Sequence, residues 1–223
     1  MTTSATPSPS LRLSDRLRGI IAERVLEGSY PPGTQLKDTT LADEFNTSRA
    51  PVREALYALE MIGLVRSQPS LGTWRCGVDP ARLTDAYELR ATLEERAAQL
   101  AVPCLAEDLL TLSHALADLE RAAAAQDAQA YSRAIQRFHR HIIMMSGNRE
   151  FLRVWDFQHW ELRTRVAAQR VSHELVDFIG GHQAALKALT VGDGIGAGQQ
   201  LRGLIERFLR VHNALQTPPS ADH

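Results

Sequence analysis

The stretch TSRAPVREALYALEMIGL, residues 47–64, has the pattern of an amphipathic helix. Gly63 follows the last apolar position, as glycine often does at a helix C-terminus. Arg49 and Arg53 lie four residues apart beside the apolar stripe, near the start of the helix. Guanidinium groups placed there can reach guanine or phosphate in a DNA major groove, but this spacing also suits an ordinary solvated helix face. The apolar stripe consists of Val52, Ala55, Leu56, Leu59 and Ile62.

The neighbouring residues predict two helices before this stretch and a hairpin after it. A helical repeat over 11–25 is followed by a short helix that begins near Asp38 or Thr39, both of which suit the capping position. Short strands are predicted at 64–66 and 73–76. This order is that of a winged helix-turn-helix, although the pattern by itself also allows another small helical subdomain.

The composition is that of a soluble globular protein. The chain has 223 residues, of which 44% are hydrophobic and 23% charged, enough for one large domain or two small ones. No run approaches the roughly 18 apolar residues that cross a membrane, and the N-terminus lacks the pattern of an export signal. We therefore expect a cytoplasmic protein without a membrane partner. Cys76 and Cys104 lack the number and spacing of a disulfide framework or a zinc site.

The charge is almost balanced, with 25 basic and 26 acidic residues and a net charge of −1. Even residues 1–78 contain nine basic and eight acidic side chains. This balance excludes a protein that coats nucleic acid through a diffuse positive field, but it allows recognition by a few placed arginines.

Beyond a linker at 77–82, the pattern is helical almost to the end of the chain. Asn148 suits the cap of one helix, and Pro103 is expected to end another. The fold class is thus mainly α. We expect six helices in this part, at 81–102, 105–126, 127–146, 149–171, 174–190 and 194–215.

The N-terminal part closely resembles the GntR family of bacterial transcriptional regulators. The resemblance rests on the runs LEGSYPPGTQL at 26–36, LADEF at 41–45 and SRAPVREALYALEMIGLV at 48–65, followed by a glycine in the hairpin. It implies an N-terminal winged helix-turn-helix that binds double-stranded operator DNA.

The same resemblance implies which residues contact the operator. At the start of the second helix, where some relatives have a basic residue, Thr39 offers only a hydroxyl to phosphate, or merely caps the helix. Gly72 falls at the tip of the wing, near the minor groove. The contacts implied at the reading helix are Thr47, Ser48, Arg49 and Arg53.

The rest of the chain resembles the all-helical FCD effector-binding domain, in its smaller VanR-like form of six helices. The matching runs are AYELRATLEERAAQLA at 86–101, FHRHIIMMSGN at 138–148 and HQAALKALTVGD at 182–193. In this family the FCD domain usually also forms the dimer contact. The implied organisation is a tail at 1–10, a winged helix-turn-helix at 11–78, an FCD domain at 79–216 and a second tail at 217–223.

Arg90 and Glu94 interrupt the apolar stripe of the helix predicted at 81–102. A buried guanidinium is costly without a partner. Either Glu94 is that partner, or Arg90 awaits an anionic ligand inside the bundle, and the family resemblance favours the ligand. His139, His159 and His182 also fall on apolar faces. Each one suits a core histidine, but together they indicate a polar effector pocket.

Many FCD domains bind a divalent metal through an aspartate and three histidines. Of the matching positions, His139 and His182 are retained, whereas Ile135 and Leu204 replace the aspartate and the last histidine. Two imidazoles leave a divalent ion underligated unless water, the effector or His159 completes its shell. We therefore expect no tightly bound metal and no other cofactor.

These features predict a ligand-responsive transcriptional regulator. We expect a homodimer that binds a palindromic operator and responds to a small carboxylate, with repression the commoner outcome in the family. A regulator whose pocket has decayed and a metal-dependent sensor with an incomplete histidine site are alternatives. An enzyme is not expected, because no nucleophile motif, second carboxylate or complete ligand set accompanies the histidines.

Overall fold

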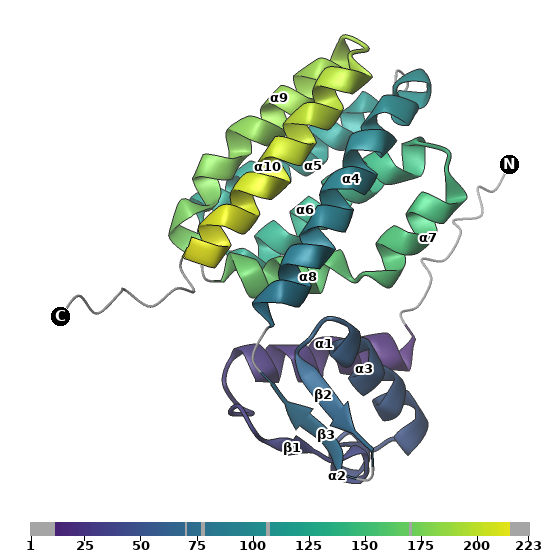
Figure 1. Cartoon of the computed structure of the whole chain (residues 1–223), viewed down its shortest axis with the longest axis vertical. Helices are drawn as coiled ribbons and strands as arrows, with labels where there is room; N and C mark the ends of the chain where they lie inside the picture. Colours follow the sequence, from purple (N-terminus) through teal and green to yellow (C-terminus); the bar gives the residue numbers. More distant parts are fainter. Residues whose placement is uncertain (1–11, 70, 77–78, 106–107, 170, 215–223) are drawn as a thin grey trace, which may run out of the picture. The chain divides into compact units, whose positions relative to one another are not determined.

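The computed structural model describes residues 12–69, 71–76, 79–105, 108–169 and 171–214 (Figure 1). The chain divides into two compact units, Met1–Asp79 and Pro80–His223. The tails predicted at 1–10 and 217–223 lie outside the described residues, as do residues 77–78 of the predicted linker. Within the described part, no helix is both long enough and apolar enough to cross a membrane.

The first unit packs three helices against a small antiparallel sheet. Its elements are α1 (Leu13–Leu26), β1 (Gln35–Leu36), α2 (Asp38–Glu44), α3 (Arg49–Met61), β2 (Val65–Gln68) and β3 (Gly72–Arg75). The strand order is β1-β3-β2, with Gln35 opposite Trp74 and Ser67 opposite Thr73. The sequence pattern predicts the hairpin but not β1, since two residues are too few to show the alternation of a strand.

The predicted reading helix is α3, and its apolar stripe forms the centre of this unit. All five predicted stripe residues are buried, and they pack against α1, which buries Leu17, Ile21 and Val25. Gly63 follows the helix with a φ of +79°, a left-handed conformation that glycine adopts without strain. The stripe and the glycine end of this helix are therefore confirmed.

The predicted side-chain cap of α2 is wrong. The residue before the helix is Lys37, and no side chain caps the first turn. Asp38 is the first residue of the helix, and its carboxylate accepts hydrogen bonds from Arg49 and Arg53 instead. Hydrogen bonds between charged groups are stronger than a bond to a neutral backbone N–H, which explains the preference.

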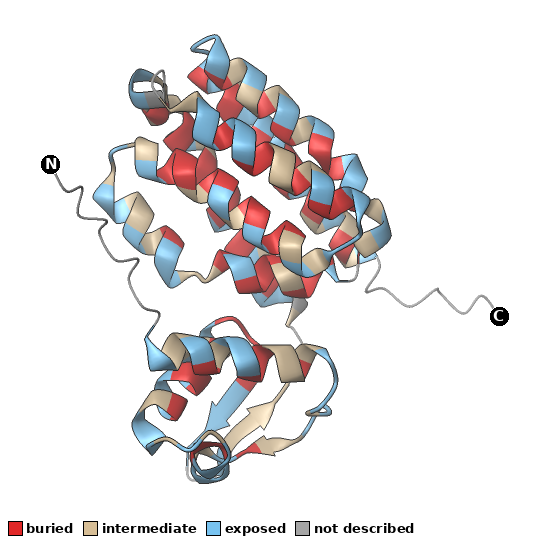
Figure 2. Cartoon of the chain, turned by 180° about the vertical axis from the view of Figure 1, so that it is seen from behind, coloured by how far each residue is buried: buried red, intermediate tan, exposed pale blue. Residues whose placement is uncertain are grey.

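The second unit is a helical bundle. Its helix α4 packs along α10 and α6, while α5 packs on α6 and α9 on α10 (Figure 1). Buried residues, red in Figure 2, gather on the inner faces of these helices. The elements are α4 (Pro80–Leu105), α5 (Leu109–Ala124), α6 (Ala128–Met145), α7 (Arg149–Phe157), α8 (Trp160–Ala168), the 3-10 helix η1 (Ser172–Phe178), α9 (Ile179–Thr190) and α10 (Gly194–Ala214).

The predicted single helix at 149–171 is in fact two helices, α7 and α8. They separate at His159, which has a φ of +52°. Trp155 and Trp160 are both fully buried, and their ring centroids lie 5.7 Å apart. On one continuous helix, residues five apart would point about 140° away from each other. The break lets both indoles face the same interior, an arrangement that local periodicity cannot show.

Other helix boundaries also differ from the prediction, among them the start of α5, which lies at Leu109 instead of 105. α4 continues through Pro103, because a proline in the last turn removes only one hydrogen bond of the helix. The helix predicted at 174–190 begins as η1 and becomes α-helical at Ile179. Asn148 caps α7 through the Glu150 and Phe151 amides, as predicted.

Glycines bring α10 close to α4. A Cβ atom at Gly198 would lie 2.6 Å from the backbone oxygen of Glu95, and one at Gly194 would lie 2.9 Å from Gln99 Cα. Backbone atoms in a packed interior cannot give way easily, so neither position accommodates a larger side chain without a shift. The contact joins the first and last helices of the unit.

Replacing Gly198 by alanine is expected to destabilise the protein by about 1–3 kcal/mol, because the added methyl group overlaps the α4 backbone. Gly203→Ala is the matched control in the same helix, since a Cβ there meets no atom within 4 Å. It should be neutral or stabilise by up to about 1 kcal/mol through helix propensity. Urea unfolding followed by tryptophan fluorescence measures both changes. Equal stability of the two variants would contradict the close helix contact.

Candidate nucleic-acid interface and effector pocket

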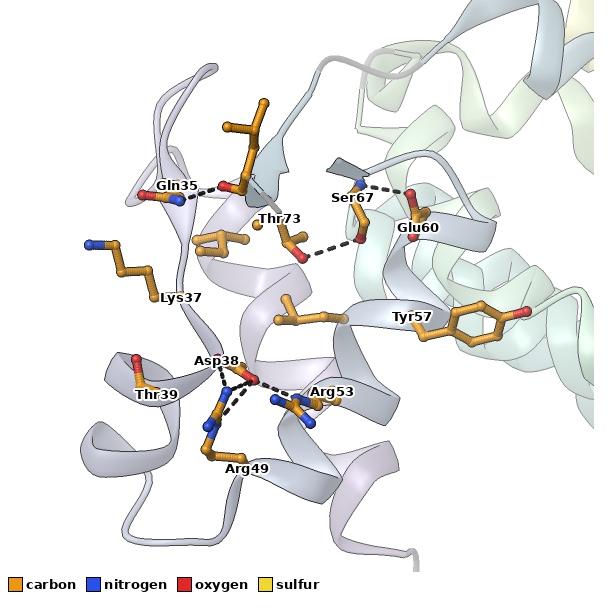
Figure 3. Close-up of a pocket in the computed structure, with 14 residues that line it drawn as sticks. Gln35, Lys37, Asp38, Thr39, Arg49, Arg53, Tyr57, Glu60, Ser67 and Thr73 are labelled. Carbon is orange, nitrogen blue, oxygen red and sulfur yellow. Dashed lines mark hydrogen bonds and ion pairs between the residues drawn. The ribbon is translucent and has the colours of Figure 1, made fainter. Parts of the chain in front are cut away.

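A groove of about 690 Å³ lies between α3, the start of α2 and the β2–β3 hairpin (Figure 3). Its charged side chains are Lys37, Asp38, Arg49, Arg53 and Glu60. Three cations and two anions leave only a small positive excess, so this groove attracts phosphate weakly through charge alone. Binding of phosphate in the groove must therefore depend on where the arginines are placed.

Asp38 joins the two arginines of α3 (Figure 3). Its Oδ2 accepts from Arg53 Nε at 2.6 Å and from Arg49 Nη2 at 2.9 Å and Nε at 3.2 Å. Partial burial raises the pKa of Asp38, but the hydrogen bonds from Arg53 and Arg49 outweigh it and hold the pKa below its ordinary value. The carboxylate is thus ionised at neutral pH and paired with both cations.

The wing is tied to β1 and to α3 by side chains that line the groove. Gln35 Nε2 donates to the backbone oxygen of Leu71 at 2.7 Å. Gly72 has a φ of +93°, and a Cβ there would lie 3.0 Å from Gln35 Nε2. On the other strand, the Ser67 backbone N–H donates to Glu60 Oε1 at 2.7 Å. These contacts hold the hairpin at one side of the groove.

Thr47 and Ser48 lie at the N-terminal end of α3. The Thr47 backbone N–H donates to Ala42 O at 2.9 Å, which fixes the turn between α2 and α3. Ser48 is exposed and occupies the capping position, but its hydroxyl makes no capping hydrogen bond. The hydroxyl and the first amides of α3 are therefore available to an anion.

A small cavity lies inside the second unit, between α4, α6, α8, α9 and α10. Its lining includes Arg90, Tyr131, His139, Thr164 and His182. Its volume is about 20 Å³, which is enough for a single water molecule. The cavity is therefore small, with a few polar side chains in a largely apolar lining.

Arg90 is 2% exposed, and its guanidinium has charged, hydroxyl and aromatic partners. Its Nε donates to Glu94 Oε1 at 2.6 Å and its Nη1 to Thr164 Oγ1 at 3.1 Å. Its Cζ lies 5.6 Å from the ring centroid of Tyr87 and 5.3 Å from those of Trp155 and Trp160. Glu94 supplies the counter-charge that a buried guanidinium needs, and the rings add cation–π attraction.

Glu94 also begins a chain of polar contacts that crosses three helices. Its Oε2 contacts Nδ1 of His139, whose Nε2 lies 3.1 Å from His182 Nε2. His182 Nδ1 donates to the backbone oxygen of Phe178 at 2.9 Å. Burial raises the pKa of Glu94, but His139 and Arg90 outweigh it, so the pKa is lowered and the carboxylate is ionised.

Polar atoms with unused hydrogen-bonding capacity meet at the cavity. Burial lowers the pKa of His139 and lowers that of His182 well below its ordinary value, so both rings are neutral at pH 7. With His139 Nδ1–H directed at Glu94 and His182 Nδ1–H at Phe178, the facing Nε2 atoms both carry lone pairs, so their 3.1 Å contact is not itself a hydrogen bond. The Tyr131 hydroxyl has no hydrogen-bond partner among the described residues. A ligand or water with hydrogen-bond donors would satisfy these groups.

Comparison with known proteins accounts for both units. A family model described as "Bacterial regulatory proteins, gntR family" matches residues 13–74, and one described as "FCD domain" matches residues 85–207. The chain belongs to the GntR family. It is a DNA-binding transcriptional regulator with a C-terminal FCD domain, and it is not an enzyme.

Several relatives of this GntR regulator are named as repressors. A probable D-xylose utilization operon transcriptional repressor from Paenarthrobacter nicotinovorans is 26% identical over 209 residues, 94% of this chain and 89% of that protein. The gluconate operon transcriptional repressor of Bacillus subtilis (strain 168) is 29% identical over 137 residues, 60% of this chain and 55% of that protein. The structure of E. coli McbR/YncC shares the fold, with a TM-score of 0.73 at 21% identity over 93% of this chain and 100% of that one.

The structure brings four of the residues predicted to contact DNA into the groove, namely Thr39, Arg49, Arg53 and Gly72. Thr47 and Ser48 lie next to it, at the end of α3. The sequence pattern did not reveal Asp38 as the partner of the arginines or Gln35 as a support of the wing. Only the helix-start position of Asp38 could have drawn attention to it, since residue spacing does not reveal contacts between separate elements.

Of the residues predicted for the effector pocket, Arg90, His139 and His182 line the cavity. Glu94 is not among the described lining residues, but it contacts both Arg90 and His139. His159 is not among the described lining residues, because it forms the junction between α7 and α8. Tyr131 was missed, although its position eight residues before His139 places it on the same face of α6.

Ile135 and Leu204 line the cavity beside the two histidines. Their alkyl side chains offer no ligand to a metal at the positions where related domains have an aspartate and a histidine. Among the described residues, no group of three or more His, Cys, Asp or Glu side chains is placed to hold a metal ion. Glu94, the carboxylate nearest the histidines, is engaged by Arg90 and His139.

The neutral state of His182 predicts that stability falls in acid. The unfolded state binds a proton at this histidine below about pH 6.5, whereas the folded state does not until much lower pH, so stability decreases as pH falls. Between pH 6 and pH 5 the free energy of unfolding should fall by about 1.4 kcal/mol because of His182, which is the change per pH unit when unfolding binds one proton. His182→Gln should flatten the pH dependence by that amount.

This prediction is measured by urea unfolding of chelator-treated protein at pH 5, 6 and 7. A Trp74→Phe background removes the indole of the first unit, so the fluorescence comes from the two buried tryptophans of the second. His173→Gln is the control, since the His173 side chain is 62% exposed. Parallel pH profiles for wild type and His182→Gln would refute the prediction.

Proposed function

We propose that this GntR regulator is a repressor that binds a palindromic operator as a homodimer and responds to a small organic acid. The observation that supports operator reading is the pair of guanidinium groups, Arg49 and Arg53, at the groove between α3 and the wing. In a dimer two copies of α3 would enter successive major grooves on one face of the DNA. The names of the relatives above favour repression. Operator binding would take place in the cytoplasm, where bacterial DNA lies.

Operator affinity in this proposal comes from position rather than from a diffuse field. Arg49 and Arg53 are 52% and 62% exposed, enough to reach bases or phosphates. A bidentate arginine–guanine contact discriminates against a wrong base by about 1–3 kcal/mol, and a dimer makes each contact twice. Non-specific binding is expected to be modest, because the cations of the groove are largely balanced.

The effector would be a small carboxylate that also carries a hydroxyl group. Arg90 and Thr164 would bind the carboxylate, and the facing Nε2 atoms of His139 and His182 would accept from a hydroxyl. The cavity of about 20 Å³ is too small for such a ligand. Binding therefore requires side chains or helices to move, and that movement supplies a route by which ligand changes operator affinity.

A regulator that no longer senses a ligand is the second candidate. It is favoured by the small cavity and by the Arg90–Glu94 ion pair, which already satisfies the cation without a ligand. In that case the chain from Arg90 to His182 would be a structural element of the bundle. The two candidates differ in whether any small acid stabilises the folded protein.

Arg53→Ala is expected to lower affinity for the operator at least about 10-fold, since one arginine contact per half-site is lost. The operator is first selected from random duplexes with the wild-type protein, and affinity is then measured by fluorescence anisotropy. Arg16→Ala, an exposed arginine of α1 outside the groove lining, is the control. Sedimentation should give the same oligomeric state for all three proteins. Unchanged operator affinity in Arg53→Ala would overturn the assigned reading helix.

A hydroxylated carboxylate is expected to raise the melting temperature of the wild-type protein, because a ligand that binds only the folded state stabilises it. The thermal-shift panel contains sugar acids, hydroxy acids, simple carboxylates and amino acids, each with and without zinc. Arg90→Gln and His182→Gln should reduce the shift. No shift with any compound supports the non-sensing candidate, and a shift that requires zinc supports a metal-dependent sensor.

A further inference from the structure

Asp38 is the acidic residue closest to the arginines that are assigned to DNA reading. Both oxygens of its carboxylate accept hydrogen bonds from α3, since Oδ1 also accepts from Arg49 Nη2 at 3.2 Å. The Asp38 side chain is 22% exposed, far less than either arginine. It lies on the inner side of the groove and leaves the guanidinium groups on the outer side.

The two arginines are held differently. Arg49 turns its Nε and Nη2 edge to the carboxylate, whereas Arg53 donates only its Nε. No hydrogen bond joins the terminal nitrogens of Arg53 to a described residue. The guanidinium of Arg53 therefore keeps its forked end for a base edge or phosphate, and Arg49 keeps its Nη1.

The support of Asp38 is rigid on both sides. On one side, β1 ends at Leu36, which is buried and pairs with Thr73 of β3. On the other side, Leu41 and Ala42 bury the inner face of α2. A carboxylate on such a support restricts the rotamers of two long side chains that would otherwise repel each other.

We propose that Asp38 is a positioning residue that sets operator selectivity. It holds Arg49 and Arg53 as one oriented pair, and its negative charge cancels part of the attraction that two free arginines would have for any DNA backbone. The fixed orientation of the pair raises affinity for the operator, and the cancelled charge lowers affinity for other sequences. This inference rests on the proposed function, because it requires that the groove binds DNA.

The test measures affinity for the selected operator and for a scrambled duplex at several salt concentrations, using the full-length protein. Asp38→Asn should lower the operator-to-scrambled affinity ratio at least about 10-fold, through tighter scrambled binding and no tighter operator binding. Asp43→Asn changes the same charge in the same helix, on an exposed residue outside the groove lining, and should leave the ratio within about 2-fold of wild type.

Asp38→Glu separates charge from position. It keeps the negative charge but moves the carboxylate by one methylene, so scrambled binding should stay as weak as in wild type while operator binding weakens. A ratio unchanged in Asp38→Asn would overturn the inference, as would an equal fall in Asp43→Asn. If Asp38→Asn raised the affinity for both duplexes equally, Asp38 would only weaken DNA binding in general, and this result would also overturn its positioning role.

A readout without DNA distinguishes failure of this inference from failure of the proposed function. The Nε–H signals of Arg49 and Arg53 in ¹H–¹⁵N spectra, assigned with Arg49→Lys and Arg53→Lys, should shift and exchange faster with water in Asp38→Asn. Unchanged signals would refute the pairing itself. If the wild type selects no operator from random duplexes, the proposed function fails and the selectivity role of Asp38 fails with it, whatever the spectra show.

Discussion

The second unit depends on the burial of one cation. Removing the Arg90 guanidinium from water is unfavourable unless charge and hydrogen bonds replace its hydration. Glu94 supplies the charge, Thr164 on α8 supplies a hydroxyl, and Trp155 and Trp160 supply aromatic faces from α7 and α8. These requirements explain why the chain breaks at His159, since both indoles must face the same side chain.

The chain of contacts from Arg90 makes the bundle interior both polar and specific. Glu94 on α4 contacts His139 on α6, and His139 contacts His182 on α9. Removing Arg90, Glu94 or His139 takes a polar partner away from a buried neighbour, and a buried polar group that loses its partner costs more than the bond itself contributes. The same polar groups that hold the helices together are those that a ligand would have to engage. Under the proposed function, stability and sensing would therefore depend on the same side chains.

A different balance governs the first unit, where the charges lie near the surface. Asp38 holds Arg49 and Arg53 in a partly exposed setting, where ion pairs contribute little to stability because water and salt screen them. Its effect is on orientation and on the net charge of the groove. The near-neutral composition of the whole chain is repeated there, within the groove between α3 and the wing.

The sequence by itself determined the order of helices and hairpin, the apolar stripe of α3 and the family. It also singled out the candidate site residues Arg49, Arg53, Arg90, His139 and His182. These features are local, because helical periodicity, glycine at a helix end and charged residues within an apolar stripe are all visible over a few residues. Only the tertiary structure decided that Asp38 pairs with the arginines, that Glu94 serves both Arg90 and His139, and that α7 and α8 are separate. Each of these joins residues on different elements or satisfies two buried side chains at once, and such constraints arise only when the elements pack.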